Sequence, residues 1–234
     1  MGKIRPGHAA PLQEAYRLMH EHHGHLGWWP GETPFEVCIG AILTQNTNWS
    51  NVEKALENLK QEGLLEPRKL FGVAEARLAQ LLRPSGYFRV KAKRVRAFLR
   101  VLVEDFDADL KRLFEGETAA VRQRLLGING IGPETADSML LYAGGHVSFV
   151  VDAYTRRIFQ RHAWCADDAG YDEIQELCSG SLRQKPSAEL LDYWQDYHAQ
   201  IVIVGKTFCR KSNPRCELCP LRSLLPENSQ RGVR

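Results

Sequence analysis

Asp152 is the acidic residue whose position best combines a structural and a chemical role. It stands where the pattern predicts the start of a helix over residues 153–161, so its carboxylate can accept hydrogen bonds from the first N–H groups of that helix. The same N–H groups favour the ionised form of the acid. The position therefore indicates an N-cap, a carboxylate that stabilises positive charge on a substrate, or both at once.

Three cysteines near the end of the chain form a second group with possible chemistry. Their spacing is Cys209-x6-Cys216-x2-Cys219, so three thiols lie within eleven residues. In a protein without signs of secretion, thiols this close together favour metal or cluster ligation over disulfide bonds. An iron–sulfur cluster, a zinc ion and a loop held by packing alone all remain open.

Two tryptophans and two amides form a third group. Trp28 and Trp29 lie in a loop between glycines, where they can pack a junction between helices or stack on an unpaired base. Gln45 and Asn46 end a long apolar run, between two predicted helices, where such residues cap a loop. Both interpretations of the tryptophans stay open.

A glycine-rich turn between two predicted helices lies between the tryptophan and amide residues and Asp152 in the sequence. The stretch 125–145 reads as a helix, a tight turn and a second helix. Gly127, Gly130 and Gly132 lie where such a turn needs positive φ or a close backbone approach, and Pro133 suits the first turn of the second helix. A turn that ends in a helix start presents N–H groups that bind phosphate whatever the base sequence.

Capping residues predict where several other helices begin. Thr33 with Glu36 predicts the start of a helix that is apolar nearly all round and therefore buried. Ser50 with Glu53 predicts the start of the next helix, and Thr118 the start of the helix that leads into the glycine-rich turn. The pattern indicates a predominantly helical chain.

The composition is that of an ordinary globular protein, with 234 residues, 44% hydrophobic content and a formal charge of +3. The charge alone is too small to indicate nucleic-acid binding. Basic residues are concentrated instead on one predicted helix, where they can form a solvated face or contact the DNA backbone. They are Arg89, Lys91, Lys93, Arg94, Arg96 and Arg100. Since no apolar run is long enough to cross a bilayer and no signal peptide is evident, we expect a cytoplasmic protein without membrane association.

The hairpin, the downstream aspartate and the cysteine loop together resemble the helix-hairpin-helix DNA glycosylases of the endonuclease III superfamily. The resemblance covers roughly residues 33–219, and its matching residues are Leu126, Gly127, Gly130, Ile131, Gly132, Thr135, Ala136, Val151, Asp152, Thr155 and Arg156. It implies an all-α fold of two helical lobes with a DNA-binding cleft. One lobe spans 33–145 with the helix-hairpin-helix at about 119–143, and the other combines 1–32 with 146–234 and the cysteine loop 209–219.

The resemblance also implies roles for individual residues. Asp152 would stabilise the positive charge that develops on the sugar and orient the attacking water. The Trp-Trp-Pro arrangement looks like the branch that removes alkylated bases, so Trp28 and Trp29 would line the base pocket with Glu134 and Lys206, although Lys206 is also typical of a solvated helix end. The expected DNA contacts are Gln45, Asn46, Lys91, Gly127, Gly130, Ile131, Gly132, Thr135 and Arg156.

Glu134 points to the type of reaction. Members of this family that also cut the strand have a lysine in the second hairpin helix, and this chain has Glu134 there. A carboxylate cannot form a Schiff base, so we expect a monofunctional enzyme that uses water as the nucleophile. Alkylated, cationic purines such as 3-methyladenine suit that chemistry because they are good leaving groups. We expect a monomer acting on double-stranded DNA with a flipped damaged base.

Two other functions remain as alternatives. The first is an endonuclease III-type glycosylase for oxidised pyrimidines or for mismatched thymine or adenine, and Glu134 argues against its strand-cutting form. The second is a helix-hairpin-helix DNA-binding module without catalysis, which would have no use for Asp152 or for the tryptophan pair. An enzyme is therefore the better prediction.

The cysteine loop departs from the family pattern at one position. The family's loop holds a [4Fe-4S] cluster through a fourth cysteine, and this chain has Leu225 at that place. The resemblance thus implies a cluster held by Cys209, Cys216 and Cys219 with a fourth ligand that is distant or is not a cysteine.

Overall fold

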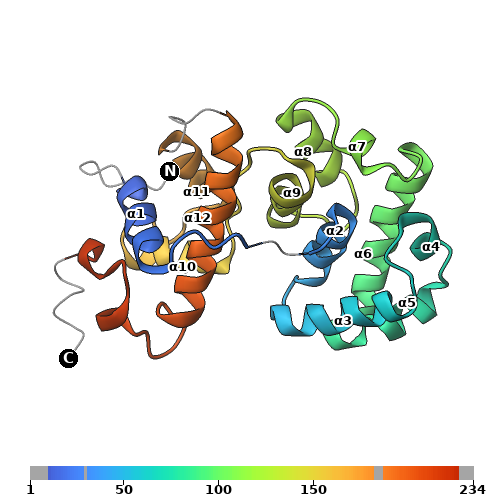
Figure 1. Ribbon diagram of the computed structural model, residues 1–234, viewed down its shortest axis with the longest axis horizontal. Helices are drawn as coiled ribbons and strands as arrows, with labels where there is room; N and C mark the ends of the chain where they lie inside the picture. Colours follow the sequence, from blue (N-terminus) through green and yellow to red (C-terminus); the bar gives the residue numbers. More distant parts are fainter. Residues whose placement is uncertain (1–9, 29–30, 182–186, 227–234) are drawn as a thin grey trace. The chain divides into compact units, whose positions relative to one another are not determined.

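The computed structural model describes residues 10–28, 31–181 and 187–226. This part of the chain contains twelve α-helices joined by short turns and no β-strand, which confirms the predicted all-α fold (Figure 1). Contacts divide the chain into two compact units. Unit 1 combines Met1–Trp28 with Phe149–Arg234, and unit 2 is Trp29–Ser148.

Helix α2 (Pro34–Leu43) is the buried centre of unit 2. Its N-cap is Thr33, whose hydroxyl accepts from the Glu36 N–H at 3.1 Å, as the sequence predicts. The Glu36 carboxylate accepts in turn from the backbone N–H of Glu32 at 3.1 Å. Because the helix is apolar all round, it packs against α3 (Trp49–Gln61), α6 (Phe88–Arg100) and α9 (Pro133–Met139) at once.

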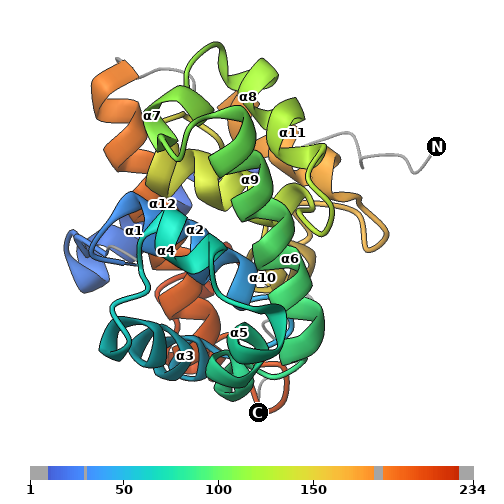
Figure 2. The ribbon, with the colours of Figure 1, turned by 90° about the vertical axis from the view of Figure 1, so that its right-hand side faces the viewer.

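The remaining helices of unit 2 are α4 (Pro67–Phe71), α5 (Glu75–Leu81), α7 (Leu110–Leu113) and α8 (Thr118–Leu126). Helices α4 and α5 pack against α6, which runs along this unit in Figure 2. Two predicted caps are wrong. Asn48, not Ser50, accepts from the Asn51 N–H and caps α3, while Glu117, not Thr118, precedes α8.

A buried ion pair joins the two helices of the hairpin. Asp137 on α9 is 0% exposed, and its carboxylate accepts from Arg122 Nε at 2.9 Å and Arg122 Nη2 at 3.0 Å. The Ser148 hydroxyl donates to the same carboxylate at 2.6 Å. Since a buried charge is costly unless it is paired and hydrogen-bonded, this network fixes α8 against α9 and so fixes the turn between them.

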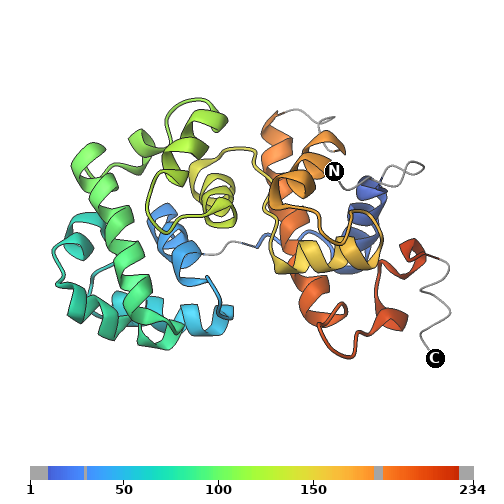
Figure 3. The ribbon, with the colours of Figure 1, turned by 180° about the vertical axis from the view of Figure 1, so that it is seen from behind.

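Unit 1 is built around the long helix α12 (Ser187–Thr207), which packs against α1 (Leu12–His23) and α10 (Ala153–Arg161). Helix α11 (Tyr171–Ser181) completes the unit, and Figure 3 shows α10 lying across α12. Gly205 permits that close crossing, since a Cβ there would lie 2.4 Å from Tyr154 Cδ1. None of the described helices is long and apolar enough to span a membrane.

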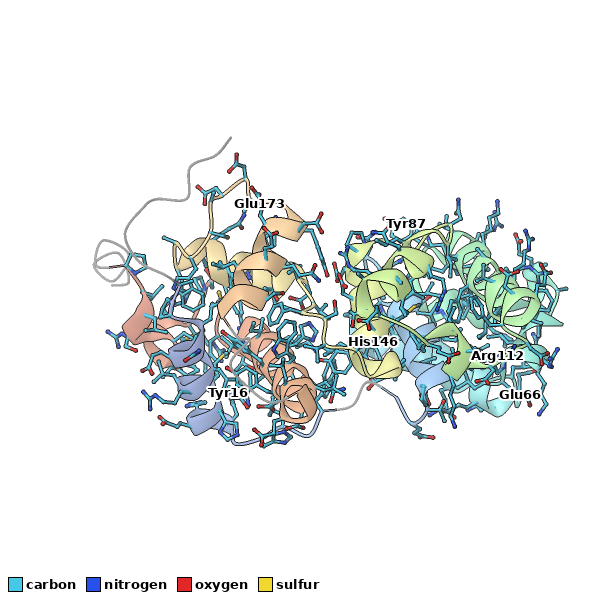
Figure 4. All side chains as sticks on the ribbon, turned by 90° about the horizontal axis from the view of Figure 1, so that it is seen from above. Tyr16, Glu66, Tyr87, Arg112, His146 and Glu173 are labelled. Carbon is cyan, nitrogen blue, oxygen red and sulfur yellow. The ribbon has the colours of Figure 1, made fainter. Side chains whose placement is uncertain are left out.

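A second polar network fixes the segment that follows α1. Asp196 on α12 is buried and accepts from the Tyr16 hydroxyl at 2.8 Å and from the Leu26 N–H at 2.9 Å. Tyr16 is labelled in Figure 4 on the α1 side of this contact. Because Leu26 lies two residues before Trp28, the same carboxylate holds the start of the tryptophan segment against α12.

Candidate active site

The turn of the helix-hairpin-helix contains a position that only glycine fits. Gly130 has φ +87, and a Cβ at this position would lie 2.3 Å from Arg94 Cγ on α6. Gly127 and Gly132, on either side of it, are exposed. The basic helix α6 therefore lies directly against the predicted phosphate-binding turn within unit 2.

Gln45 connects the end of α2 to this turn. Its amide nitrogen donates to Gly130 O at 3.0 Å and to Thr135 Oγ1 at 2.9 Å, while its amide oxygen accepts from Arg94 Nη1. In this structure the Gln45 side chain is therefore hydrogen-bonded within unit 2, and its contact with DNA stays a prediction. Asn46 is the exposed amide of the pair. Its backbone has a positive φ of 55, a left-handed conformation that asparagine tolerates well.

Three other predicted DNA contacts are buried. Thr135 is held by Gln45, and Ile131 packs into the hydrophobic core of unit 2. Lys91 is only 1% exposed, and its ammonium donates to Leu43 O at 2.8 Å and Ser85 O at 2.6 Å. Burial, with a contribution from Arg94, lowers the Lys91 pKa to about 8. Their side chains are not available to phosphate, because Lys91 caps the end of α2 and the other two hold the hairpin in place.

The exposed basic residues of α6 are Arg89, Lys93 and Arg100. Just before this helix, Tyr87 is 71% exposed and has φ 45 (Figure 4). An exposed aromatic ring in a strained conformation beside basic side chains suits contact with bases or sugars. No local pattern in the sequence indicates this exposure, since a tyrosine between Gly86 and Phe88 is equally typical of a buried helix start.

Asp152 is the N-cap of α10, as the sequence predicts. One carboxylate oxygen, Oδ1, accepts from the Thr155 N–H at 2.7 Å and from the Thr155 hydroxyl at 2.9 Å. The other oxygen, Oδ2, lies 3.8 Å from Nε2 of His198 on α12, and the carboxylate is only 13% exposed. Capping therefore fixes one oxygen and leaves the second directed into a mostly buried region of unit 1.

His198 is a candidate site residue that the sequence reasoning missed. It is buried on α12, and burial lowers its pKa although the Asp152 carboxylate acts in the opposite direction. The indole of Trp28 lies with its centroid 6.3 Å from the imidazole centroid. Trp28, His198 and Asp152 thus form a group that comes from three separate segments of the sequence, and no motif links them. Trp29 lies outside the described residues.

The remaining predicted site residues are less enclosed. Glu134 is exposed in the first turn of α9, and Lys206 is exposed in the last turn of α12. Arg156 is half-buried on α10, where its guanidinium donates to Ala169 O. Arg156 thus supports the loop after α10 in this structure, and its DNA contact stays a prediction.

Cys209, Cys216 and Cys219 line one small cavity of unit 1 together with Leu225. Burial raises the pKa of Cys219 to about 11 and also raises that of Cys216. Within the described ranges, no three histidine, cysteine or acidic side chains lie close enough to bind a single metal ion as they stand. The three thiols therefore surround a common volume without converging on one point.

Comparison with known proteins agrees with this geometry. Residues 39–184 match the HhH-GPD superfamily of base excision DNA repair proteins. A Methanocaldococcus jannaschii protein assigned to the DNA repair glycosylases is 44% identical over 212 residues, which cover 90% of this chain and 94% of that protein. Endonuclease III of Bacillus subtilis is 26% identical over 198 residues, covering 85% and 83%.

Two solved structures are similar in fold. The 3-methyladenine DNA glycosylase MagIII of H. pylori, bound to 1,N6-ethenoadenine, has a TM-score of 0.74 at 29% identity and covers 83% of this chain and 97% of its own. A non-covalent endonuclease III–DNA complex has a TM-score of 0.76 at 21% identity and covers 100% of both chains. The chain belongs to the HhH-GPD superfamily of base excision DNA repair proteins. It is a base excision DNA repair glycosylase with the fold of endonuclease III.

Gly130→Ala is expected to weaken binding to damaged and undamaged duplexes by the same factor, about tenfold or more. The added methyl group must displace Arg94 and strain a backbone with φ +87, at a cost of about 1–3 kcal/mol. Fluorescence anisotropy with both kinds of duplex measures the effect. Gly63→Ala is the control, because Gly63 has φ +65 but no atom within 4 Å of the added methyl group. A loss confined to one lesion would contradict a phosphate-binding role.

Proposed function

We propose that this protein is a monofunctional DNA glycosylase that removes an alkylated, positively charged purine such as 3-methyladenine. The observation that carries the proposal is the group formed by Trp28, His198 and Asp152 in unit 1, where the carboxylate oxygen lies 3.8 Å from the imidazole and the indole lies beside that imidazole. An aromatic wall next to a fixed carboxylate suits a cationic base attached to a sugar that becomes positive as the bond breaks.

Asp152 supplies the electrostatic part of the reaction. Because Thr155 holds Oδ1 with two hydrogen bonds, the carboxylate keeps one orientation without reorganising during the reaction. Its second oxygen, Oδ2, stabilises the oxocarbenium-like sugar and orients the attacking water. The bond between C1′ and the base nitrogen breaks, and its electron pair leaves with the base. Water forms the new bond to C1′ and passes a proton to the Asp152 carboxylate.

Trp28 and His198 supply the selectivity for a cationic base. A stacked indole attracts a positive ring through its π-face. Since burial favours the neutral imidazole of His198, that side chain adds no positive charge that would repel the base. The similarity to a 3-methyladenine glycosylase bound to ethenoadenine, at 29% identity, supports a purine substrate turned out of the duplex and bound by one monomer.

Glu134 supports cleavage without a covalent intermediate. It occupies the exposed first turn of α9, where strand-cutting members of the family have a lysine. A carboxylate cannot attack C1′ to form an imine, so water remains the nucleophile. The product is then an abasic site in an intact strand.

Duplexes with one methylated adenine are expected to give abasic sites that break only after hot alkali, and borohydride should trap no enzyme–DNA adduct. The assay compares products with and without alkali on duplexes that each contain one lesion: methylated purine, ethenoadenine, thymine glycol or a T·G mismatch. A strand-cutting relative is the positive control for trapping. A trapped adduct would overturn the monofunctional mechanism, and release of thymine glycol without release of alkylated purines would favour the oxidised-pyrimidine alternative.

A further inference from the structure

Two arginines of α10 hold the cysteine loop against the helix. Arg157 donates to Cys209 O at 2.7 Å, and Arg161 donates to Arg210 O at 2.6 Å and Lys211 O at 3.1 Å. Arg161 also donates to the Cys209 sulfur at 3.3 Å. The loop is therefore ordered by contacts to its backbone, and a cationic group lies at one of its thiols.

The donors around this small cavity suit an iron–sulfur cluster better than a single ion. Three thiols line it, and Arg161 and Arg222 line it too, so positive charge is available to balance thiolates. A cluster offers a separate iron atom to each ligand, so its ligands need to surround a common volume, as these three do. One zinc ion would require the donors to meet at one point, and no such set exists in the described part of the chain.

The cavity has a fourth candidate donor in addition to the three thiols. His162, which directly follows α10, lines the same cavity and is only 6% exposed. Its Nδ1 lies 3.2 Å from the carbonyl oxygen of Leu224. That carbonyl can only accept, so Nδ1 carries the proton and Nε2 keeps a lone pair. A backbone carbonyl that orients an imidazole in this way is typical of histidines that ligate metals.

Leu225 leaves the cysteine loop one cluster ligand short, so that a donor from outside the loop is needed. It occupies the fourth position of the loop pattern and lines the cavity with a side chain that cannot ligate iron. Because Leu224 is the residue that orients His162, the donor lies beside the position from which the cysteine is missing.

We propose that His162 provides the fourth ligand, through Nε2, of an iron–sulfur cluster whose other ligands are the thiolates of Cys209, Cys216 and Cys219. Each thiol releases its proton when it binds iron, while the neutral imidazole binds without releasing one. The cluster therefore carries one negative charge less than a four-thiolate cluster in the same oxidation state. Replacing thiolate by imidazole raises the reduction potential of such clusters.

The test compares four proteins purified and reconstituted without oxygen: wild type, His162→Ala, Leu225→Cys and the double variant His162→Ala/Leu225→Cys. Iron and acid-labile sulfide per chain, visible absorption and reduction potential are measured for each. Wild type is expected to bind iron and sulfide, and His162→Ala to hold the cluster at least about tenfold more weakly. The double variant should regain it at a lower potential, since it has four thiolates. His22→Ala, on the exposed end of α1, is the control.

A spectroscopic measurement keeps the proposal testable if His162→Ala does not fold. The reduced wild-type cluster should show a nitrogen hyperfine coupling in pulsed EPR that changes when histidine is labelled with nitrogen-15. The double variant should lack that coupling. Iron-free wild type after reconstitution, a cluster without nitrogen coupling, or stoichiometric zinc without sulfide would each overturn the proposal.

Discussion

Asp152→Asn is expected to reduce the single-turnover rate of base release by about 1,000-fold or more while duplex affinity changes by less than about twofold. Asparagine is as good an N-cap as aspartate, so the hydrogen bonds to Thr155 and the start of α10 are retained. What disappears is the negative charge at Oδ2, which is needed only when the sugar becomes positive. The loss should therefore fall on the chemical step and not on binding.

Two controls accompany this measurement. The melting temperature of Asp152→Asn should match that of wild type, because both residues cap the helix. Thr155→Val removes the hydroxyl donor to Oδ1 but keeps the backbone N–H donor and the charge, so its effect should be much smaller. Undiminished base release by Asp152→Asn would show that this acid is only an N-cap.

The helical fold could be predicted because its signals are local. Thr33 caps α2 through Glu36, three residues along, and Asp152 caps α10 through Thr155, also three residues along. A capping pattern this short contains all the residues that decide where the helix begins. Asn48 caps α3 in place of the predicted Ser50. Several polar residues near this helix start can accept from the same N–H groups, and their preferences for the N-cap position are nearly equal.

The fate of single polar side chains could not be predicted, since distant segments decide it. Lys91 belongs to a basic run that resembles a solvated face, yet Leu43 O lies 48 positions away in sequence and binds its ammonium. Gln45 is held by Gly130 O, 85 positions away. In both cases a backbone carbonyl accepts a hydrogen bond from a polar side chain that is distant in sequence and close in the fold.

The same reason explains why His198 was missed. In sequence it is one polar residue on a long, mostly buried helix, which is more typical of a satisfied core position than of a site. Only the crossing of α10 and α12 brings it within 3.8 Å of Asp152. Its proximity to Trp28 depends in turn on the hydrogen bond from Leu26 to Asp196. The carboxylate of the site is thus predictable, while its surroundings follow from tertiary structure.

Trp28→Ala is expected to reduce excision of a methylated adenine by about 10- to 100-fold, the effect of losing about 1–3 kcal/mol of stacking. The indole lies beside His198 and is held there through the Leu26–Asp196 hydrogen bond, so its removal takes away an aromatic wall without removing Asp152. The decrease should be larger for a cationic base than for a neutral lesion of similar size, because only the cationic base loses the cation–π attraction.

Trp28→Phe is the matched variant, since a smaller ring keeps stacking but offers a weaker π-face. It should retain most activity on a neutral lesion and lose more on methylated adenine. Trp29→Ala, measured in parallel, shows which indole of the pair carries the effect. If Trp28→Ala lowers excision of cationic and neutral bases equally, the ring acts only by filling space beside His198, and the proposed selectivity for alkylated purines would have to come from another part of the pocket.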